Sequence, residues 1–340
     1  MRYTTPLFAF LVIASILSPA ETKKLHEERN QVASVRLGTN NVLTDVACDK
    51  DGDTFFTVWD PATEEPADSP LLMLDSAGNL KGRFKSSRKT LALSSYEDHW
   101  EPTALLPSGG VARLVWSKDT LRLGVFSVDG NLQSRVQLDA PAITPYQVAV
   151  FPSGAFLVSG LRGGYKSFTA LYDKSGHLEK TLYLPDDSEI DSAAKVGDSR
   201  YSRSPMAGNR AISSGRARLG EDGNVYLMRR TSPAIVYVIS PSGEILRRLR
   251  IEPAEAGQLP LEMQIAGGRL ALEFSLSCSG DRCEGTNFTV ADAMTGRTII
   301  DYAVENSHGV FSCYNANPER FNFLTITDGH QLKLTEAIAK

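Results

Sequence analysis

The chain has 340 residues, 42% of them hydrophobic, and a formal net charge of -4. This length allows two average domains or one large repeat domain. Charges of both signs are mixed along the sequence, which excludes an extended nucleic-acid surface because phosphate binding requires clustered cations. The two short basic runs at 81–89 and 247–250 are typical of solvated outer strands instead.

Residues 1–20 have the pattern of a secretory signal peptide. Arg2 precedes an apolar run, and Ser18-Pro19-Ala20 supplies small residues before a cleavage site. The run is too short to cross a bilayer, which takes roughly 20 apolar residues. We therefore predict cleavage before Glu21, secretion or export to the periplasm, and a mature chain without a transmembrane segment.

Two kinds of glycine-containing turn alternate along the rest of the chain. The first kind contains Gly52, Gly109, Gly154, Gly223 and Gly267, and the second contains Gly78, Gly130, Gly176, Gly243 and Gly296. Between them Val, Ile, Leu, Phe and Tyr alternate with polar residues, as in half-buried strands, and we expect no helix after residue 30. A four-stranded antiparallel unit of roughly 40 to 50 residues is the signature of a β-propeller blade.

The last unit of this series lacks one strand, and the other end of the chain can supply it. A further turn of the first kind is expected at 315–320, followed by only two strands. Residues 31–38 alternate apolar and polar side chains, as an amphipathic strand does. Pairing it with the last blade would remove the open edges of the array. We therefore predict an all-β, six-bladed propeller over residues 31–340, closed by its N-terminal strand, with residues 21–30 as a lead-in.

Four cysteines in an exported chain are consistent with two disulfides. Cys278 and Cys283 flank a tight polar turn, so we favour their pairing. Cys48 and Cys313 lie at similar distances before the turns of the first and last units, and a bond between them would lock the ring. Two buried thiols are the alternative for this second pair, because cysteine packs as a small hydrophobe.

The turn sequences resemble those of six-bladed propellers of the NHL-repeat and gluconolactonase-like group. The resemblance rests on DSAGNL (75–80), VDGNL (128–132), KSGHL (174–178), PSGEI (241–245) and EDGNVY (221–226). It implies a propeller over roughly residues 31–336. The group includes binding scaffolds, calcium-dependent sugar-lactone hydrolases and zinc-dependent lyases, so the resemblance implies no single activity.

One connection is longer than the others. Gly176 and Gly223 lie about twice as far apart as Gly130 and Gly154, which indicates an insertion at about 186–213, between the third and fourth blades. Long loops in compact domains are functional lids or disordered excursions. Tyr201, Arg203 and Arg210 are its best candidates for ligand contact.

Aligning the inner strands places one polar residue of each blade near the mouth of the central channel. This predicted polar ring contains Asp45, Glu101, Gln147, Arg216, Glu262 and His308. Its acids suit Ca²⁺, which prefers oxygen ligands, and Arg216 suits a carboxylate or phosphate. The alternative is that these side chains are tolerated because the channel is hydrated.

The sequence carries no motif of a known catalytic centre. His99, His308 and His330 lack zinc-ligand spacing, and residues 49–53, DKDGD, fit a blade turn better than a calcium loop. Two functions remain open. The first is an exported scaffold that binds an unidentified small molecule, peptide or protein at the channel mouth. The second is a Ca²⁺-assisted hydrolase or lyase of lactone-like substrates.

Overall fold

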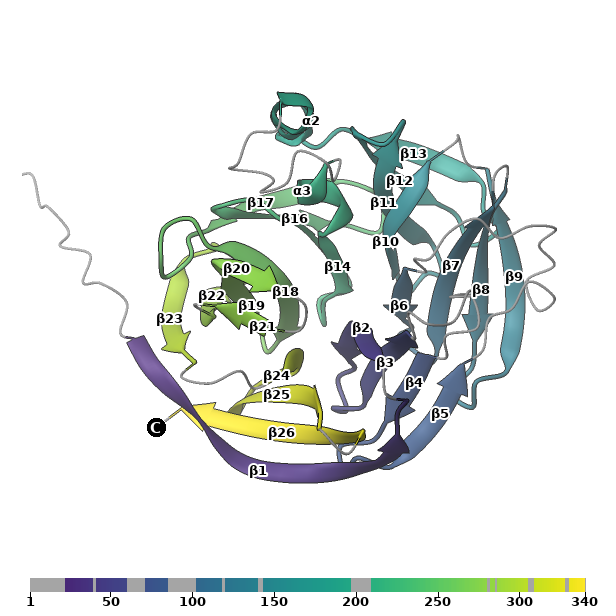
Figure 1. The fold of residues 1–340 in the computed structure, drawn as a ribbon. Helices are drawn as coiled ribbons and strands as arrows, with labels where there is room; N and C mark the ends of the chain where they lie inside the picture. Colours follow the sequence, from purple (N-terminus) through teal and green to yellow (C-terminus); the bar gives the residue numbers. More distant parts are fainter. Residues whose placement is uncertain are drawn as a thin grey trace, which may run out of the picture.

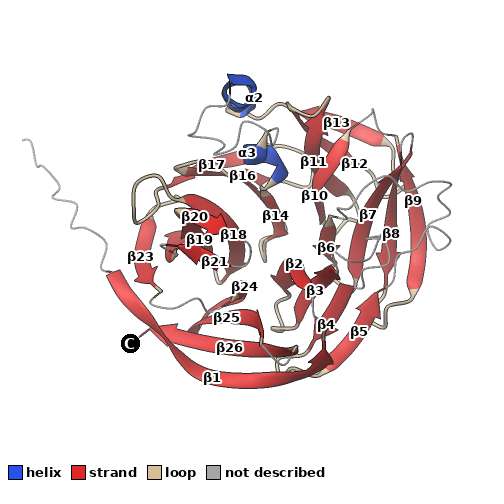
Figure 2. Ribbon diagram, viewed as in Figure 1, coloured by secondary structure: helices blue, strands red, loops and turns tan. Residues whose placement is uncertain are grey.

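The computed structural model describes residues 22–38, 41–59, 71–84, 102–117, 120–139, 143–196, 209–279, 282–284, 286–304, 309–327 and 330–339. Strands dominate these ranges, and their sheets are arranged radially around a common centre (Figures 1 and 2). The predicted all-β propeller arrangement is therefore confirmed.

Four of the sheets contain four antiparallel strands each, and every one is continuous in sequence. The first contains β2 (Val42–Cys48), β3 (Thr54–Trp59), β4 (Leu71–Leu74) and β5 (Leu80–Phe84). The second contains β6 (Thr103–Leu105), β7 (Val111–Ser117), β8 (Thr120–Phe126) and β9 (Leu132–Leu138). The third contains β10 (Thr144–Val150), β11 (Phe156–Arg162), β12 (Lys166–Tyr172) and β13 (Leu178–Leu182). The fourth contains β14 (Arg216–Leu219), β15 (Val225–Arg229), β16 (Ala234–Ile239) and β17 (Ile245–Ile251).

The remaining long strands form one eight-stranded sheet, in the order β18-β19-β22-β23-β1-β26-β25-β24. They are β18 (Leu259–Ala266), β19 (Arg269–Ser275), β22 (Asn287–Asp292), β23 (Thr298–Ala303), β1 (Thr22–Arg36), β26 (Gln331–Ala339), β25 (Glu319–Ile326) and β24 (Val310–Ala316). A hairpin of β20 (Ser277–Ser279) and β21 (Arg282–Glu284) extends from it. The hydrogen-bonded sheets thus differ from the predicted six separate ones, because β1 joins two groups of strands.

The predicted closure of the ring by the N-terminal strand is confirmed. β1 pairs antiparallel with β26, with Gln31 opposite Leu334. Its first residues, Thr22–Lys24, also pair in parallel with Asp301–Ala303 of β23. The strand therefore begins earlier than residue 31, within the segment that the sequence assigned to a lead-in. Figure 1 shows β1 running along the outside of the ring beside β26.

The innermost strands form a closed series. β2 contacts β6, β6 contacts β10, and the series continues through β14, β18 and β24 back to β2. The disulfide between Cys48 and Cys313 lies at this last junction, between β2 and β24. The predicted bond is confirmed, and the alternative of two free thiols is wrong. Between the sheets lie separate apolar clusters, so the core is divided into layers rather than gathered at the centre.

The second kind of glycine turn has a packing role that accounts for its repetition. A Cβ at Gly176 would collide with the carbonyl oxygen of Gln137, on the outer strand of the preceding sheet. Gly130 lies in the same way against Arg83, and Gly78 lies against Ala33 of β1. All three glycines have positive φ, which side chains disfavour. Each such turn therefore packs against the outer strand of the preceding group of strands, and the turn of the first sheet packs against β1.

The structure corrects one expectation about secondary structure. Two helices occur in the insertion, α2 (Asp187–Val196) and α3 (Arg210–Ser213). α2 begins with Asp187 and Glu189 and ends with Lys195, an arrangement that complements the helix dipole. Its buried residue Ile190 packs with Leu161, Ala211 and Ile212. The expectation of no helix after residue 30 was wrong because so short an apolar face gives little periodic signal.

Candidate functional site

Irregular pairing turns polar side chains of the inner strands toward one another. The register of β10 shifts between Pro145 and Gln147, and that of β18 shifts between Pro260 and Glu262. Proline cannot donate to a ladder, so it favours such a bulge. A bulge re-aims the side chain that follows it. Gln147 and Glu262, two members of the predicted polar ring, both follow such a proline and are both buried.

Glu262 is bonded by two arginines. Arg216 Nε donates to Glu262 Oε2 at 2.6 Å, and Arg218 Nη2 donates to Oε1 at 2.7 Å. The sequence Arg-Ala-Arg on β14 places both guanidinium groups on one face, since side chains of a strand alternate. The structure therefore brings Arg216 and Glu262 together as an ion pair, and it adds Arg218, which the sequence analysis did not select.

Arg218 also joins strands that are not neighbours. Its Nη2 donates to the backbone oxygen of Val46 on β2 at 3.0 Å. In the series of inner strands, two strands separate β14 from β2 in either direction. The register of β2 shifts between Thr44 and Ala47, so the Val46 carbonyl lies in an irregular part of the ladder. Arg218 thus reaches across the centre of the ring.

A second glutamate lies beside Glu262. Glu273 on β19 is directly opposite Glu262 in the antiparallel pair, and it is only 8% exposed. Burial, with the charge of Glu262 added, raises the pKa of Glu273 to about 8, although the charge of Arg216 acts in the opposite direction. Glu273 therefore carries its proton at neutral pH. We call Arg216, Arg218, Glu262 and Glu273 the inner cluster.

The described side chains of the inner cluster include two guanidinium groups. At neutral pH both groups bond the carboxylate of Glu262, while Glu273 is protonated. Gln147 extends the cluster: its Nε2 donates to the oxygen of Ile212 at 2.8 Å, and the oxygen of neighbouring Gly215 accepts from Arg216 Nη1 at 2.9 Å. The arrangement suits an anion better than a cation, because Glu262 already has two positive partners.

For the other three members of the predicted polar ring, the structure does not describe the side chains. Glu101 and His308 lie outside the described residues, and of Asp45 only the backbone, in β2, is described. Within the described ranges, no group of three His, Cys, Asp or Glu side chains is arranged to hold a metal ion. Cys278 and Cys283 face each other in the β20–β21 hairpin, but their side chains are not described, so their disulfide stays a prediction.

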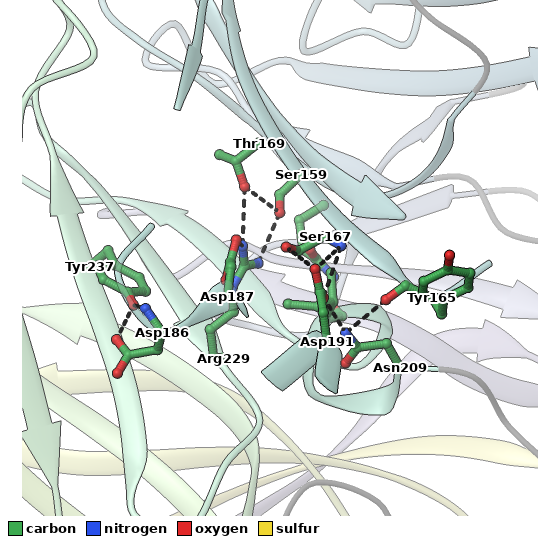
Figure 3. Close-up of polar contacts among 12 residues, drawn as sticks. Ser159, Tyr165, Ser167, Thr169, Asp186, Asp187, Asp191, Asn209, Arg229 and Tyr237 are labelled. Atoms are coloured by element: carbon green, nitrogen blue, oxygen red, sulfur yellow. Dashed lines mark hydrogen bonds and ion pairs between the residues drawn. The ribbon is translucent and has the colours of Figure 1, made fainter. Parts of the chain in front are cut away.

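The insertion is fixed to the propeller by a second, buried network (Figure 3). Arg229 on β15 is fully buried, and it bonds both carboxylate oxygens of Asp187 at the start of α2, at 3.0 and 2.9 Å. Its Nη1 donates to Ser159 Oγ at 2.9 Å, and its Nη2, which also bonds Asp187, donates to Thr169 Oγ1 at 3.1 Å. A buried ion pair is tolerated when its charges are paired and also hydrogen-bonded. The Arg229–Asp187 pair meets both conditions.

Two more carboxylates hold α2 and the preceding residue. Asp191 accepts from the backbone N–H of Ser167 at 2.9 Å and from Asn209 Nδ2 at 2.8 Å. Asp186 accepts from Tyr237 and from Arg248, and its bonds to Arg248 lower the pKa of its carboxyl. Figure 3 shows Asp186, Asp187 and Asp191 directed at different parts of the sheets. The described ends of the insertion are therefore anchored between the third and fourth sheets.

The predicted lid contacts are only partly described. Tyr201 and Arg203 lie outside the described residues, and Arg210 is the first residue of α3, half-buried. Arg210 does not belong to the inner cluster. Signals for the anchoring were present in the sequence, since acidic residues at 186, 187 and 189 and Lys195 mark the start and end of a helix. Nothing in the sequence marked Arg229 or Glu273, because both lie inside ordinary strand patterns.

Comparison with known proteins shows the fold and no more. No known family model matches the sequence, and no curated protein matches it either. The WD40 domain of Neurospora crassa Pan2 is similar in structure, with a TM-score of 0.50 and 8% identity over 94% of this chain and 97% of that chain. The PQQ-bound aldose sugar dehydrogenase of Streptomyces coelicolor is similar with a TM-score of 0.50 and 10% identity, over 95% of this chain and 99% of that chain.

These similarities establish a propeller. One of these structures is a WD40 domain and the other an enzyme, so the fold does not select an activity. None of the helices in the described ranges has the length and apolar character needed to span a membrane.

Proposed function

We propose that the chain is an exported six-bladed propeller that binds an anionic ligand at the inner cluster as a scaffold, without chemical turnover. Its ligand is a small molecule, peptide or protein segment that presents a carboxylate or phosphate group. The observation that carries the proposal is the convergence of Arg216 and Arg218 on one carboxylate, with the neighbouring Glu273 uncharged. Arg218 Nε is also buried without a hydrogen-bond partner among the described residues, and a guanidinium donor of this kind suits a carboxylate or phosphate.

The blade count rests on the outer turns. Gly78, Gly130, Gly176, Gly243 and Gly296 each lie against the outer strand of the preceding sheet. For Gly78 that strand is β1, which makes β1 the outer strand of a group with β24, β25 and β26. The eight-stranded sheet then counts as two blades joined where Thr22–Lys24 crosses to β23. Six blades agree with the NHL-like turn sequences.

Export is supported by two independent features. Residues 1–20 have the composition of a signal peptide. The Cys48–Cys313 disulfide requires an oxidising compartment, such as the periplasm or the extracellular space.

Thermal unfolding with sulfate, acetate and CaCl2 as separate probes tests the proposed ligand class. A ligand that binds only the folded state raises the melting temperature with its concentration. We expect sulfate or acetate to raise the melting temperature of the wild type and to have a much smaller effect on Arg216→Gln. Arg250→Gln is the matched control, since Arg250 lies on the outer strand β17 and pairs with Glu252 just beyond its end. Stabilisation by Ca²⁺ alone, abolished by Asp45→Ala or Glu262→Ala, would favour the calcium-dependent hydrolase or lyase instead.

A further inference from the structure

The face of the sheet that carries Glu262 presents two more polar side chains. Glu262 is opposite Glu273, and two residues further along β18 Gln264 is opposite Ala271. Side chains two residues apart on a strand share a face, so Glu262, Gln264 and Glu273 lie on the same side. Met263 and Leu272 occupy the opposite side, in an apolar cluster with the fourth sheet. Diagonal neighbours on a sheet face are within reach of long side chains.

Gln264 has a buried donor without a partner, and Glu273 is buried on the same face of the sheet. Gln264 is 3% exposed, and its Nε2 has no hydrogen-bond partner among the described residues. Glu273 is 8% exposed, and its carboxyl interacts with the charges of Glu262 and Arg216. Buried polar groups are normally bonded to protein, water or ligand. A buried donor beside a protonated carboxyl, next to two arginines, therefore indicates a place where an acceptor binds.

We propose that Glu273, in its protonated form, donates a hydrogen bond to the anionic ligand, so that Arg216, Gln264 and Glu273 form one oxyanion subsite whose affinity is controlled by pH. This inference rests on the proposed function and adds a residue and a proton to it. The neutral carboxyl can donate, whereas the ionised form has no donor and repels the anion. Glu273 keeps its proton in this hydrogen bond, and no atom is transferred.

The charged groups around Glu273 determine the direction of the pH effect. Glu262 faces it from β18, and Arg216 acts on it from β14. On its other side, β22 places Phe288 opposite it. The described part of β24 contributes the disulfide-bonded Cys313 and Tyr314, whose hydroxyl is bonded to Glu319. Deprotonation of Glu273 would therefore place a second negative charge beside Glu262, and anion affinity falls as the pH rises.

The test is calorimetric titration of the full chain with sulfate between pH 6 and pH 9.5. Sulfate keeps its charge across this range, so any change belongs to the protein. For the wild type we expect constant affinity below pH 7 and a loss of about tenfold per pH unit above about pH 8. Glu273→Gln keeps a donor at every pH, so its affinity is expected to be independent of pH. Glu273→Leu removes the donor and is expected to lower sulfate affinity at pH 6 by at least about tenfold.

A control variant and the pH dependence distinguish a role of Glu273 from anion binding itself. Glu244→Gln changes an acid at an outer turn, so it is expected to keep the wild-type pH profile. Sulfate binding by the wild type that does not vary with pH overturns the role of Glu273 and leaves the anion site intact. A loss of sulfate affinity above pH 8 in Glu273→Gln, as in the wild type, would also overturn the role of Glu273. Absence of sulfate binding at pH 6 overturns both proposals.

Discussion

Arg218 on β14 donates a hydrogen bond to the backbone oxygen of Val46 on β2, a strand on the far side of the series of inner strands. The same nitrogen also contacts Glu262 of β18. Strands of three sheets are thereby joined at one guanidinium group. Cys48 lies two residues beyond Val46 and is bonded to Cys313. The hydrogen bond from Arg218 therefore reaches β2 close to the disulfide that closes the ring.

Replacing Arg218 with Met is expected to destabilise the protein by about 2 to 4 kcal/mol, because it removes a partner of Glu262 and leaves the Val46 carbonyl without its donor. Urea unfolding measures the change. Arg250→Met is the matched control: its ion pair with Glu252 is exposed, and such pairs contribute roughly 0 to 1 kcal/mol. Equal losses in the two variants would show that the cross-ring contact contributes nothing to stability.

The face of β1 that closes the ring can be tested with two substitutions in one strand. Leu25 is 3% exposed and packs with Phe288 and Phe321, whereas Val32 is 58% exposed. Leu25→Ala is expected to cost about 2 to 5 kcal/mol in unfolding free energy, and Val32→Ala about 0.5 kcal/mol or less. Chemical denaturation at equilibrium gives both values. The reverse order would mean that β1 pairs in a register shifted by one residue.

Two glycines of similar backbone conformation separate strain from packing. Gly176 has φ +94° and Gly163 has φ +61°, but a Cβ at Gly176 would meet Gln137 while one at Gly163 would have nothing within 4 Å. Gly163→Ala is expected to cost about 1 kcal/mol from the positive φ alone. Gly176→Ala should cost at least about 2 kcal/mol more, since a backbone oxygen must move. Thermal unfolding of both variants measures these costs. Equal costs would rule out close packing of the Gly176 turn against Gln137.

The stability of the protein should depend on the protonation of Glu273. Its carboxyl has a pKa of about 8 in the folded protein and about 4.5 when unfolded, so the folded state holds the extra proton between these values. Stability is therefore greatest below about pH 4.5 as far as this group is concerned, and it falls as the pH rises towards 8. Between pH 5 and pH 9, the free energy of unfolding of Glu273→Gln is expected to rise by about 2 kcal/mol or more relative to that of the wild type.

Urea unfolding at both pH values measures that gain. A constant difference between Glu273→Gln and the wild type would contradict the buried, protonated state of Glu273. Glu244→Gln, at the exposed outer turn, is the control and should show no change with pH.

The repeated turns made much of the fold predictable. Gly-containing hairpins such as that at Gly130 carry their own conformational requirement in the sequence, and the alternation of residues 31–38 identified a strand that needed a partner. Equal positions of Cys48 and Cys313 within their units then predicted their bond. Residues 49–53 form the expected turn, in which Asp49 accepts from the N–H groups of Asp51 and Asp53.

The site was less predictable, because it depends on contacts between strands distant in sequence. Alignment of inner strands selected Gln147, Arg216 and Glu262, and the last two form an ion pair. It missed Glu273, which lies on a second strand and enters the cluster only through the pairing of β18 with β19. It also missed Arg218, whose partner Val46 lies 172 residues earlier in the sequence. Neither relationship leaves a local pattern.

Anion binding at the inner cluster can be observed directly in the anomalous difference density of a crystal grown with selenate, an analogue of sulfate, below pH 7. We expect a selenium peak within hydrogen-bonding reach of Arg216 and Glu273, and loss of that peak in Arg216→Gln crystals. Selenium peaks confined to the outer strands, with none at the inner cluster, would contradict this expectation.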